Sequence, residues 1–194
     1  MNTSQHVSNE NPNSLLTIEA DHASKIFGNR KAVDDISFQI KRGEVVGFLG
    51  PNGAGKTTTM RMLTSYYTPD IGKVKISGID TQESDIETRR KIGYLPENNP
   101  LYGDLLVHEY LSFVAELRGL NGKEKKRNIE MAVEEVRLTE VYYLPVSFLS
   151  KGYKQRTGLA GAILHKPEIL IMDEPTEGLD PNQRISMRDL IRSL

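Results

Sequence analysis

Hydrophobic and polar positions alternate near the N-terminus of this chain, a pattern that predicts β-strands. Residues 15–27 and 32–41 carry the pattern, and turn residues beginning at Gly28 separate them. Every second residue from Ile36 to Ile40 is apolar, which is typical of a half-buried antiparallel strand. The first forty residues therefore predict an antiparallel hairpin.

A different pattern follows, in which an apolar run is succeeded by helical spacing. Residues 45–49 read as a buried strand, and residues 56–66 read as a helix. Met60, Leu63 and Tyr67 fall on one side of that helix at 3.6-residue spacing. The glycine-rich stretch between the two segments therefore has a strand before it and a helix after it.

The remainder of the chain predicts further strands and helices. Strands are expected over residues 73–79, 92–96 and 168–172, and helices over 86–90, 105–117, 123–138, 150–164 and from Pro181 onward. The run 168–172 is apolar almost throughout, as in a parallel sheet that is covered on both faces. The order is antiparallel strands, a strand–loop–helix unit, a helical stretch and a strand that rejoins the core sheet, which predicts an α/β fold.

Composition narrows the class of protein. The chain has 194 residues, 38% of them hydrophobic and 26% charged, which suits a soluble protein with one large domain or a domain with an inserted lobe. A net charge of −1 argues against nucleic acid as a partner, and the lack of cysteine excludes disulfides and thiolate metal sites. No apolar stretch approaches the length of a membrane span, and the N-terminus is not a signal peptide, so we expect a cytoplasmic protein. Residues 1–14 are rich in Asn and Ser and are expected to be a disordered tail.

The glycine-rich stretch has the residues and spacing of a phosphate-binding loop. It consists of Gly50, Pro51, Asn52, Gly53, Ala54, Gly55, Lys56 and Thr57, with Thr58 next. Glycines allow backbone N–H groups to curl around a phosphate, and the helix start adds unpaired N–H groups and a positive dipole end. Lys56 would reach the β- and γ-phosphates, and the Thr57 hydroxyl would ligate Mg²⁺. This motif predicts that the chain binds a nucleoside triphosphate.

Two acids end the apolar strand at residues 168–172. A Mg²⁺–nucleotide site needs a carboxylate at the C-terminal edge of the sheet, and Asp173 suits this role. Glu174 is a candidate general base for an attacking water. Such a pair alone is more often an ordinary strand exit, and it gains its meaning from the upstream phosphate-binding loop.

At this point the chain resembles the ATPase domain of ABC transporters, from about residue 15 onward. GPNGAGKT at 50–57 matches the Walker A motif, and ILIMDE at 169–174 matches the Walker B motif with its catalytic glutamate. LSKGY at 149–153 resembles the signature motif, and GLDP at 178–181 matches the D-loop. The resemblance implies a P-loop NTPase core, a mostly parallel sheet with helices on both faces. It also implies an N-terminal antiparallel β-subdomain and an inserted helical subdomain over about residues 86–160.

The segments YLPENNPLY and LSKGYKQR resemble more narrowly the ATPase subunits of ABC-2 type exporters. This resemblance implies ATP and Mg²⁺ as cofactors, hydrolysis coupled to export, and a membrane-spanning permease on a separate chain. It places the protein at the inner face of the plasma membrane, with no nucleic-acid partner. The helical subdomain would pass the motion to the permease through the segment after Glu97.

In this family two ATPase domains pack head to tail, so that each ATP lies between two copies. By position, Ser150 and Gly152 would bind the γ-phosphate held at Lys56 of the other copy, and Asp180 would bridge the interface. A serine hydroxyl and glycine N–H groups at a helix N-terminus suit an anion. An ordinary helix cap is the alternative interpretation of Ser150.

The resemblance also assigns the base and metal ligands. Phe27 matches the aromatic residue that stacks on adenine, although core packing would equally explain a lone aromatic residue. Glu97 stands where most members have a glutamine, and it is expected to contact Mg²⁺ or its water beside Thr57 and Asp173. Lys151 and Tyr153 depart from the common signature in a way that fits the exporter subgroup.

The chain stops 14 residues after Asp180, and none of its histidines, His6, His22, His108 and His165, follows the D-loop. Family members continue into a strand with a switch histidine, so the sequence resembles a C-terminally truncated domain. Two further functions therefore stay open: a nucleotide-binding interaction module with little or no hydrolysis, and a soluble ABC ATPase of DNA repair or translation. The lack of tandem domains and of a basic patch disfavours the latter.

Overall fold

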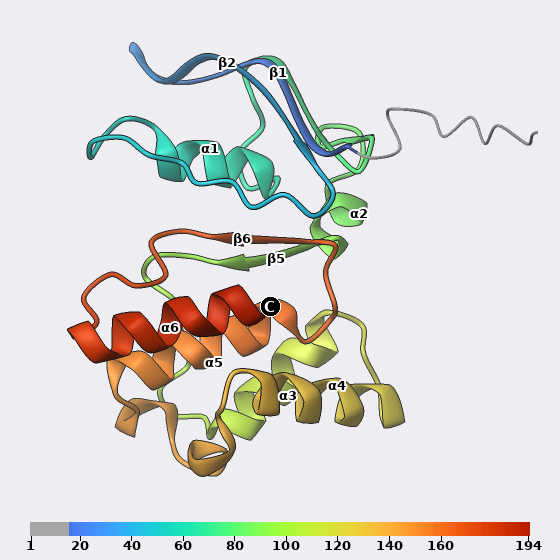
Figure 1. Ribbon diagram of the computed structural model, residues 1–194. Coiled ribbons are helices and arrows are strands. Elements are labelled where there is room, and N and C mark those ends of the chain that lie inside the picture. Colours follow the sequence, from blue (N-terminus) through green and yellow to red (C-terminus); the bar gives the residue numbers. More distant parts are fainter. Residues whose placement is uncertain (1–15) are drawn as a thin grey trace, which may run out of the picture. The chain divides into compact units, whose positions relative to one another are not determined.

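The computed structural model describes residues 16–194, and the tail expected over residues 1–14 lies outside the described residues. The chain divides into two compact units, residues 1–88 and residues 89–194. Figure 1 labels their helices and strands.

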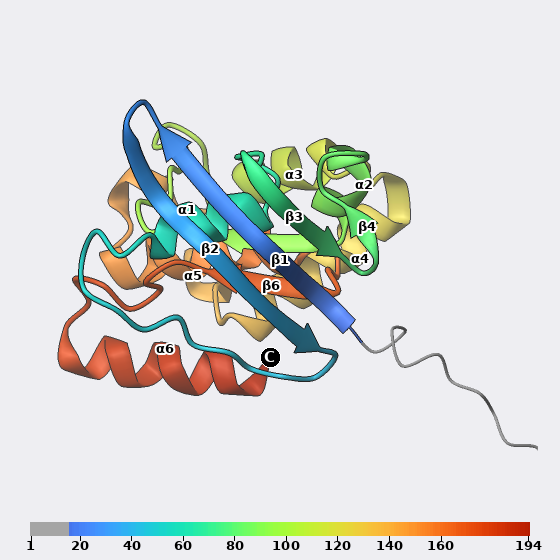
Figure 2. The same ribbon diagram turned by 90° about the horizontal axis from the view of Figure 1, so that it is seen from above.

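The first unit contains an antiparallel sheet. Its strands are β1 (Leu16–Phe27), β2 (Arg30–Lys41), β3 (Ile71–Ile76) and β4 (Ile79–Asp80), in the order β2-β1-β3-β4. Figure 2 looks onto this sheet, with helix α1 (Lys56–Leu63) packed behind it against β2 and β3. Ile18 pairs with Ile76 and Ala20 with Val74, and these side chains form a core with Met62 and Leu63 of the helix.

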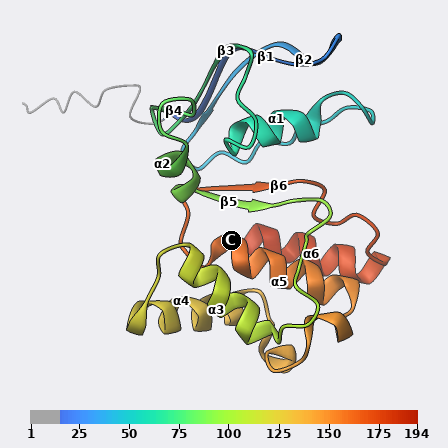
Figure 3. The same ribbon diagram turned by 180° about the vertical axis from the view of Figure 1, so that it is seen from behind.

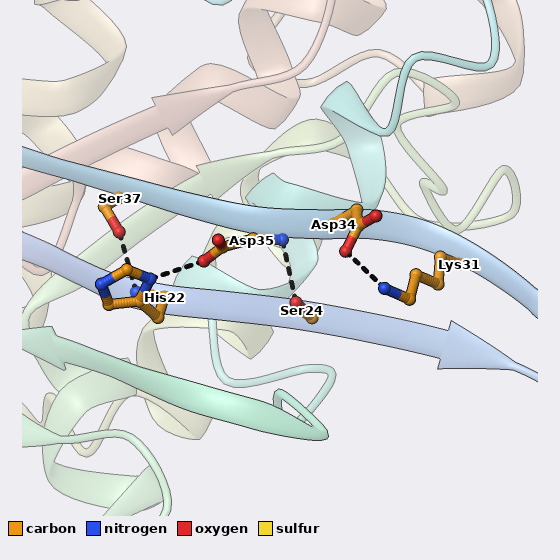
Figure 4. A network of polar contacts seen from close by, with 6 residues as sticks. All are labelled: His22, Ser24, Lys31, Asp34, Asp35 and Ser37. Carbon is orange, nitrogen blue, oxygen red and sulfur yellow. Dashed lines mark hydrogen bonds and ion pairs between the residues drawn. The ribbon is translucent and has the colours of Figure 1, made fainter.

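The hairpin of β1 and β2 contains register shifts on both sides of Ala23. His22 and Asp35 adopt positive φ angles of 47° and 50° here, and the His22 Nδ1 lies 2.6 Å from Asp35 Oδ1. The His22 backbone N–H donates to Ser37 Oγ and the Asp35 N–H donates to Ser24 Oγ, both at 2.9 Å (Figure 4). Side-chain hydroxyls thus satisfy the backbone groups that the bulges release from the ladder.

The second unit contains a parallel pair of strands and most of the helices (Figure 3). Strand β5 (Ile92–Leu95) pairs with β6 (Ile169–Met172), from Ile92 opposite Ile169 to Leu95 opposite Met172. The longer helices are α3 (Val107–Leu117), α4 (Gly122–Glu135), α5 (Lys151–Ile163) and α6 (Pro181–Ser193), while the short helix α2 (Asp85–Arg90) crosses the boundary between the units. Two 3₁₀ turns, η2 (Thr139–Val141) and η3 (Val146–Phe148), precede α5.

One hydrophobic cluster joins these helices to the parallel strands. Leu95, Leu111, Val136, Leu159 and Met187 belong to it, and each is at most 1% exposed. Helix α5 lies close to β5 because residue 93 is glycine: a Cβ there would be 2.3 Å from the Ala162 carbonyl oxygen. The packing fixes the ends of α5 and β6, where the signature and Walker B residues stand.

The predicted helices and strands are largely confirmed, and the fold is the expected α/β class. The predicted helix 56–66 ends at Leu63, and the predicted strand 73–79 is divided by a turn at Ser77 and Gly78, both with positive φ. No helix within residues 16–194 is both long and apolar enough to cross a membrane.

The prediction of a buried strand over residues 45–49 is wrong. This segment forms no strand, and Val45 and Leu49 are 99% and 96% exposed. A strand requires a neighbour to which its backbone can bond, and in the described residues of the first unit the sheet ends at β2 and β4 without pairing to this segment. Apolar composition alone does not supply that neighbour.

Candidate functional site

Glycines shape the loop that precedes α1. Gly53 and Gly55 have φ angles of 82° and 88°, which side chains other than glycine rarely adopt. Gly55 is the N-cap of α1, and a Cβ on it would lie 2.4 Å from the Ala32 carbonyl oxygen of β2. The loop can therefore lie against the sheet only with glycine at position 55.

The side chain of Lys56 contacts the backbone of this loop. Its Nζ donates to the carbonyl oxygens of Gly50 at 2.8 Å and Pro51 at 3.2 Å. Thr57 and Thr58 occupy the first turn of α1, which contains no acidic residue. An ammonium group and an uncompensated positive dipole end thus lie together beside the loop, as an anion site requires.

The hairpin that carries Phe27 lies next to the same loop. Phe27 pairs with Arg30 across the β1–β2 turn, and an Arg30 guanidinium nitrogen is 3.8 Å from the position that a Cβ on Gly53 would occupy. Phe27 is 44% exposed, and its ring contacts the Tyr67 ring edge-on with centroids 5.2 Å apart. The first unit therefore brings together the phosphate-loop residues and the predicted base-stacking residue.

The acidic residues of the prediction lie together in the second unit. Asp173, at the end of β6, is 1% exposed, and its backbone N–H donates to the Leu95 carbonyl oxygen at 2.9 Å. Its Oδ2 is buried without a hydrogen-bond partner. Glu174 follows with a φ of 49° and is exposed.

Glu97 belongs to the same acidic group. The negative charge of Glu177 is the main cause that raises the pKa of Glu97, and burial, a hydrogen bond to Glu177 and the charges of Asp173 and Glu174 add to it. A carboxyl group whose pKa is raised by neighbouring acids, together with a buried oxygen that lacks a hydrogen-bond partner, is a setting that a bound cation would stabilise.

These residues fit a magnesium ion that is held only partly by protein. Within residues 16–194 no group of three or more His, Asp or Glu side chains converges enough to hold a metal by itself. Mg²⁺ in nucleotide sites usually takes one or two protein ligands and completes its shell with phosphate and water. The Thr57 hydroxyl is in the first unit and the Asp173 and Glu97 carboxyls are in the second.

The signature and D-loop residues cap two helices of the second unit. Ser150 is the N-cap of α5, and its Oγ accepts from the Tyr153 N–H at 3.3 Å. Asp180 is the N-cap of α6 and accepts from the Gln183 N–H at 2.9 Å. Gly152 is buried, and a Cβ on it would lie 3.1 Å from the Gln183 side chain. The cap interpretation of Ser150 is therefore realised in this structure.

Sequence reasoning missed several neighbours of these residues. Glu177 lies outside the Walker motifs, Arg30 precedes its site by more than twenty residues, and Tyr67 was assigned only to a helix face. Glu177 carried a signal, because it stands three residues after the second acid of the Walker B pair. The helical spacing of Tyr67 gave no indication that its ring contacts Phe27, and the sequence around Arg30 carried no signal of its contact with the loop.

The fold and the loop together define a nucleotide-binding domain of the P-loop class. Comparison with known families and proteins makes the assignment specific: the family model described as "ABC transporter" matches residues 33–177. This chain therefore belongs to the ABC transporter family.

Curated relatives support this assignment. The bacitracin transport ATP-binding protein BcrA of Bacillus licheniformis is 41% identical over 91% of this chain. The linearmycin resistance ATP-binding protein LnrL of Bacillus subtilis is 37% identical over the same share. The chain spans 57% of the length of each of these relatives.

Solved structures show the same fold. The protein cbiO1 of Clostridium perfringens, part of the ABC transporter complex cbiONQ, aligns with a TM-score of 0.83 and 27% identity over 92% of this chain and 73% of its own. The ABC transporter cassette MJ0796, described as dimeric, aligns with a TM-score of 0.81 and 26% identity over 91% of this chain and 82% of its own.

Proposed function

We propose that this chain is the ATP-binding and ATP-hydrolysing domain of an ABC-2 type export transporter. The observation that carries the proposal is that one chain contains two half-sites. One is a phosphate-binding loop with its lysine in place, and the other is a buried, unpaired carboxylate at a strand end. The names of BcrA and LnrL, a bacitracin transport and a linearmycin resistance protein, favour export.

In the proposed reaction the first unit binds the nucleotide. Backbone N–H groups of residues 52–58 and the Lys56 ammonium hold the phosphates in the loop 50–58, and Phe27 stacks on the adenine. In this structure the Lys56 ammonium donates hydrogen bonds to the carbonyl oxygens of Gly50 and Pro51. On nucleotide binding, phosphate oxygens would replace these carbonyls as acceptors. The charge of the triphosphate makes that exchange favourable.

The second unit supplies the acid–base chemistry. Glu174 orients the attacking water and accepts its proton, while Asp173, Glu97 and Thr57 are the ligands that we assign to Mg²⁺. A bound magnesium ion neutralises charge on the phosphates. Raised by its acidic neighbours, the pKa of Glu97 returns toward its usual range when a cation is present.

We further propose that residues 15–194 form one ABC ATPase domain that works as a head-to-tail pair. Ser150, Gly152 and Asp180 of one copy complete the site of the other. The helical segment over residues 86–160 passes closure to a permease on a separate chain, at the cytoplasmic face of the plasma membrane.

The test is phosphate release from Mg²⁺–ATP by this chain, with nucleotide binding measured in parallel by calorimetry. Turnover that is lost in Glu174→Gln, with binding retained, supports the proposal. Lys56→Ala is expected to lose both turnover and binding. Binding that depends on Lys56 without any turnover would instead favour a nucleotide-binding interaction module. Absence of binding would contradict the proposed function altogether.

A further inference from the structure

We propose that Tyr67 positions the ring of Phe27 for stacking on the nucleotide base. The proposal rests on the proposed function, in which Phe27 stacks on adenine. It assigns a role to a residue that lies outside the ABC motifs, four residues after the end of helix α1.

Three aromatic rings form a cluster at the C-terminal end of β1, beside the β1–β2 turn. The Phe27 and Tyr67 rings lie 5.2 Å apart at 70°, and the Tyr66 and Tyr67 rings lie 5.0 Å apart at 67°. Both geometries are edge-to-face arrangements, which aromatic pairs prefer. Tyr67 is the middle ring and is partly buried, whereas Phe27 and Tyr66 are 44% and 69% exposed.

The end of α1 holds Tyr67 in place. After Leu63 the chain turns through Ser65, whose φ is 56°, and the Tyr67 N–H donates to the Arg61 carbonyl oxygen at 3.0 Å. The Arg61 guanidinium lies 5.9 Å from the Tyr67 ring centroid and donates to the Tyr67 hydroxyl oxygen at 3.4 Å. These bonds fix Tyr67 to helix α1, whose first turn directly follows the phosphate-binding loop.

A second set of bonds ties the segment after Tyr67 to the strand that carries Phe27. The Ile26 N–H donates to Asp70 Oδ2 at 2.6 Å, and Lys25 Nζ donates to Asp70 Oδ1 at 3.1 Å and to the Thr68 carbonyl oxygen at 2.7 Å. Lys25 Nζ also lies 5.7 Å and 5.9 Å from the Phe27 and Tyr67 ring centroids. One ammonium group thus contacts both rings and holds them as a pair.

This support matters because stacking requires an ordered ring. A half-exposed phenylalanine without a neighbour samples several rotamers, and the base would have to order it on binding. With Tyr67 against its edge, the Phe27 ring is restrained before the nucleotide arrives. Preorganisation of this kind strengthens only the base-dependent part of the affinity and leaves the phosphate-dependent part unchanged.

That distinction gives the test a readout that a purely structural role would not move. Mg²⁺–ATP and Mg²⁺–inorganic triphosphate share the phosphate contacts, and only ATP has a base. Calorimetric dissociation constants for both ligands are measured on the wild-type chain and on Tyr67→Ala, Tyr67→Phe, Phe27→Ala and the double variant Phe27→Ala/Tyr67→Ala. Tyr66→Ala is the matched control, because it removes an exposed ring of the same cluster whose aromatic contact is with Tyr67.

We expect Tyr67→Ala to weaken ATP binding about five-fold, the loss that accompanies ordering of one side chain, with triphosphate binding unchanged. Tyr67→Phe keeps the ring and should retain wild-type ATP affinity. The double variant should be no weaker than Phe27→Ala, and Tyr66→Ala should leave the ratio of the two affinities unchanged.

Two results would overturn the positioning role of Tyr67. The first is a Tyr67→Ala variant that weakens ATP and triphosphate equally, and the second is one that weakens neither. A wild-type chain that binds triphosphate as tightly as ATP, with no effect of Phe27→Ala, would remove the stacking role of Phe27 and this inference with it, while phosphate binding stands. A wild-type chain that binds neither ligand would contradict the proposed function itself.

Discussion

Glycine at position 55 is required by two separate features of the backbone. Its φ of 88° lies in the left-handed region, and a Cβ would meet the Ala32 carbonyl oxygen at 2.4 Å. We expect Gly55→Ala to lower the free energy of unfolding by about 1–2 kcal/mol, from the φ penalty alone. Because the clash also displaces the loop, Mg²⁺–triphosphate affinity should fall at least about ten-fold, since a lost charge-assisted hydrogen bond is that large.

Chemical denaturation and calorimetry measure these two effects. Gly103→Ala is the control, because its Cβ would meet only the Ser147 Cβ at an ordinary 3.7 Å. Wild-type triphosphate affinity in Gly55→Ala would contradict the close packing of the loop on β2.

We expect the buried carboxyl group of Asp173 to lower the stability of the fold while it contributes to ligand binding. Its Oδ2 lacks a hydrogen-bond partner in a residue that is 1% exposed. Asparagine at this position replaces a buried carboxyl group, so without Mg²⁺ the free energy of unfolding of Asp173→Asn should equal that of wild type or exceed it by up to about 1 kcal/mol. The same change should abolish the extra stabilisation that Mg²⁺ gives to the nucleotide-bound protein.

Thermal unfolding with and without Mg²⁺ and ATP tests both expectations. Asp189→Asn, at a carboxyl that is 63% exposed on α6, should behave as wild type in both conditions. An Asp173→Asn variant that is clearly destabilised in the absence of Mg²⁺ would show that the carboxylate has a structural partner instead.

Helix α5 and strand β5 are joined by a histidine whose pKa responds to burial. His165 Nε2 lies 3.1 Å from the Ile92 carbonyl oxygen, and its Nδ1 is buried without a partner. Burial, followed by the charge of Arg118, lowers the pKa of His165 from 6.5 to about 4. Between these two values the unfolded chain binds more protons than the folded one, so the free energy of unfolding falls as the pH falls.

We therefore expect the wild-type chain to lose stability between pH 6.5 and pH 4 more steeply than His165→Gln, which does not titrate. At pH 5 the difference should be about 1 kcal/mol, after allowance for the partial exposure of the ring. Urea titrations at pH 7 and pH 5 measure it. Parallel pH dependence in the two proteins would contradict the burial of His165.

The pKa of the exposed His22 is shifted in the opposite direction to that of His165. A hydrogen bond to Asp35, and then its charge, raises the pKa of His22. Its contribution is therefore present below pH 6.5 and is lost as the pH rises through the folded pKa, so His22→Gln should change the pH dependence in the other direction.

Elements marked by a capping residue or an unbroken apolar run could be predicted from the sequence. Helix α5 and strand β6 are examples: each has a cap or an apolar run that is sufficient to identify it. Residues 45–49 have an equally apolar composition, but a strand also needs a partner to which its backbone can bond. That partner is a property of the fold, and the described residues of the first unit do not provide it.

The same reasoning explains which site residues the sequence could identify. Gly55 and Asp173 stand inside motifs whose spacing reflects the chemistry, whereas Tyr67 and Arg30 approach the site through folding of the β1–β2 hairpin and the end of α1. The positive φ angles at His22 and Asp35 had no signal in the sequence either, because serine hydroxyls from neighbouring strand positions satisfy the bulge.

For the molecule as a whole, the capping residue Ser150 offers a test of the proposed head-to-tail pair. In this structure its hydroxyl caps α5, and in the proposed pair it also binds the phosphate at the other copy. Aspartate separates the two roles, since it caps helices as well as serine does but repels a phosphate. Ser150→Asp should therefore keep the free energy of unfolding within about 0.5 kcal/mol of wild type and lose ATP hydrolysis.

Mixing two inactive variants then tests the head-to-tail arrangement. Lys56→Ala lacks a working phosphate loop and Ser150→Asp lacks a working signature, so each alone should be inactive. In an equal mixture half of the dimers are mixed, and each mixed dimer has one site built from the intact loop of one copy and the intact signature of the other. Phosphate release should recover to about a quarter of the wild-type rate. A mixture as inactive as its components would mean that Lys56 and Ser150 do not meet across two copies, and Ser150 would then be only a helix cap.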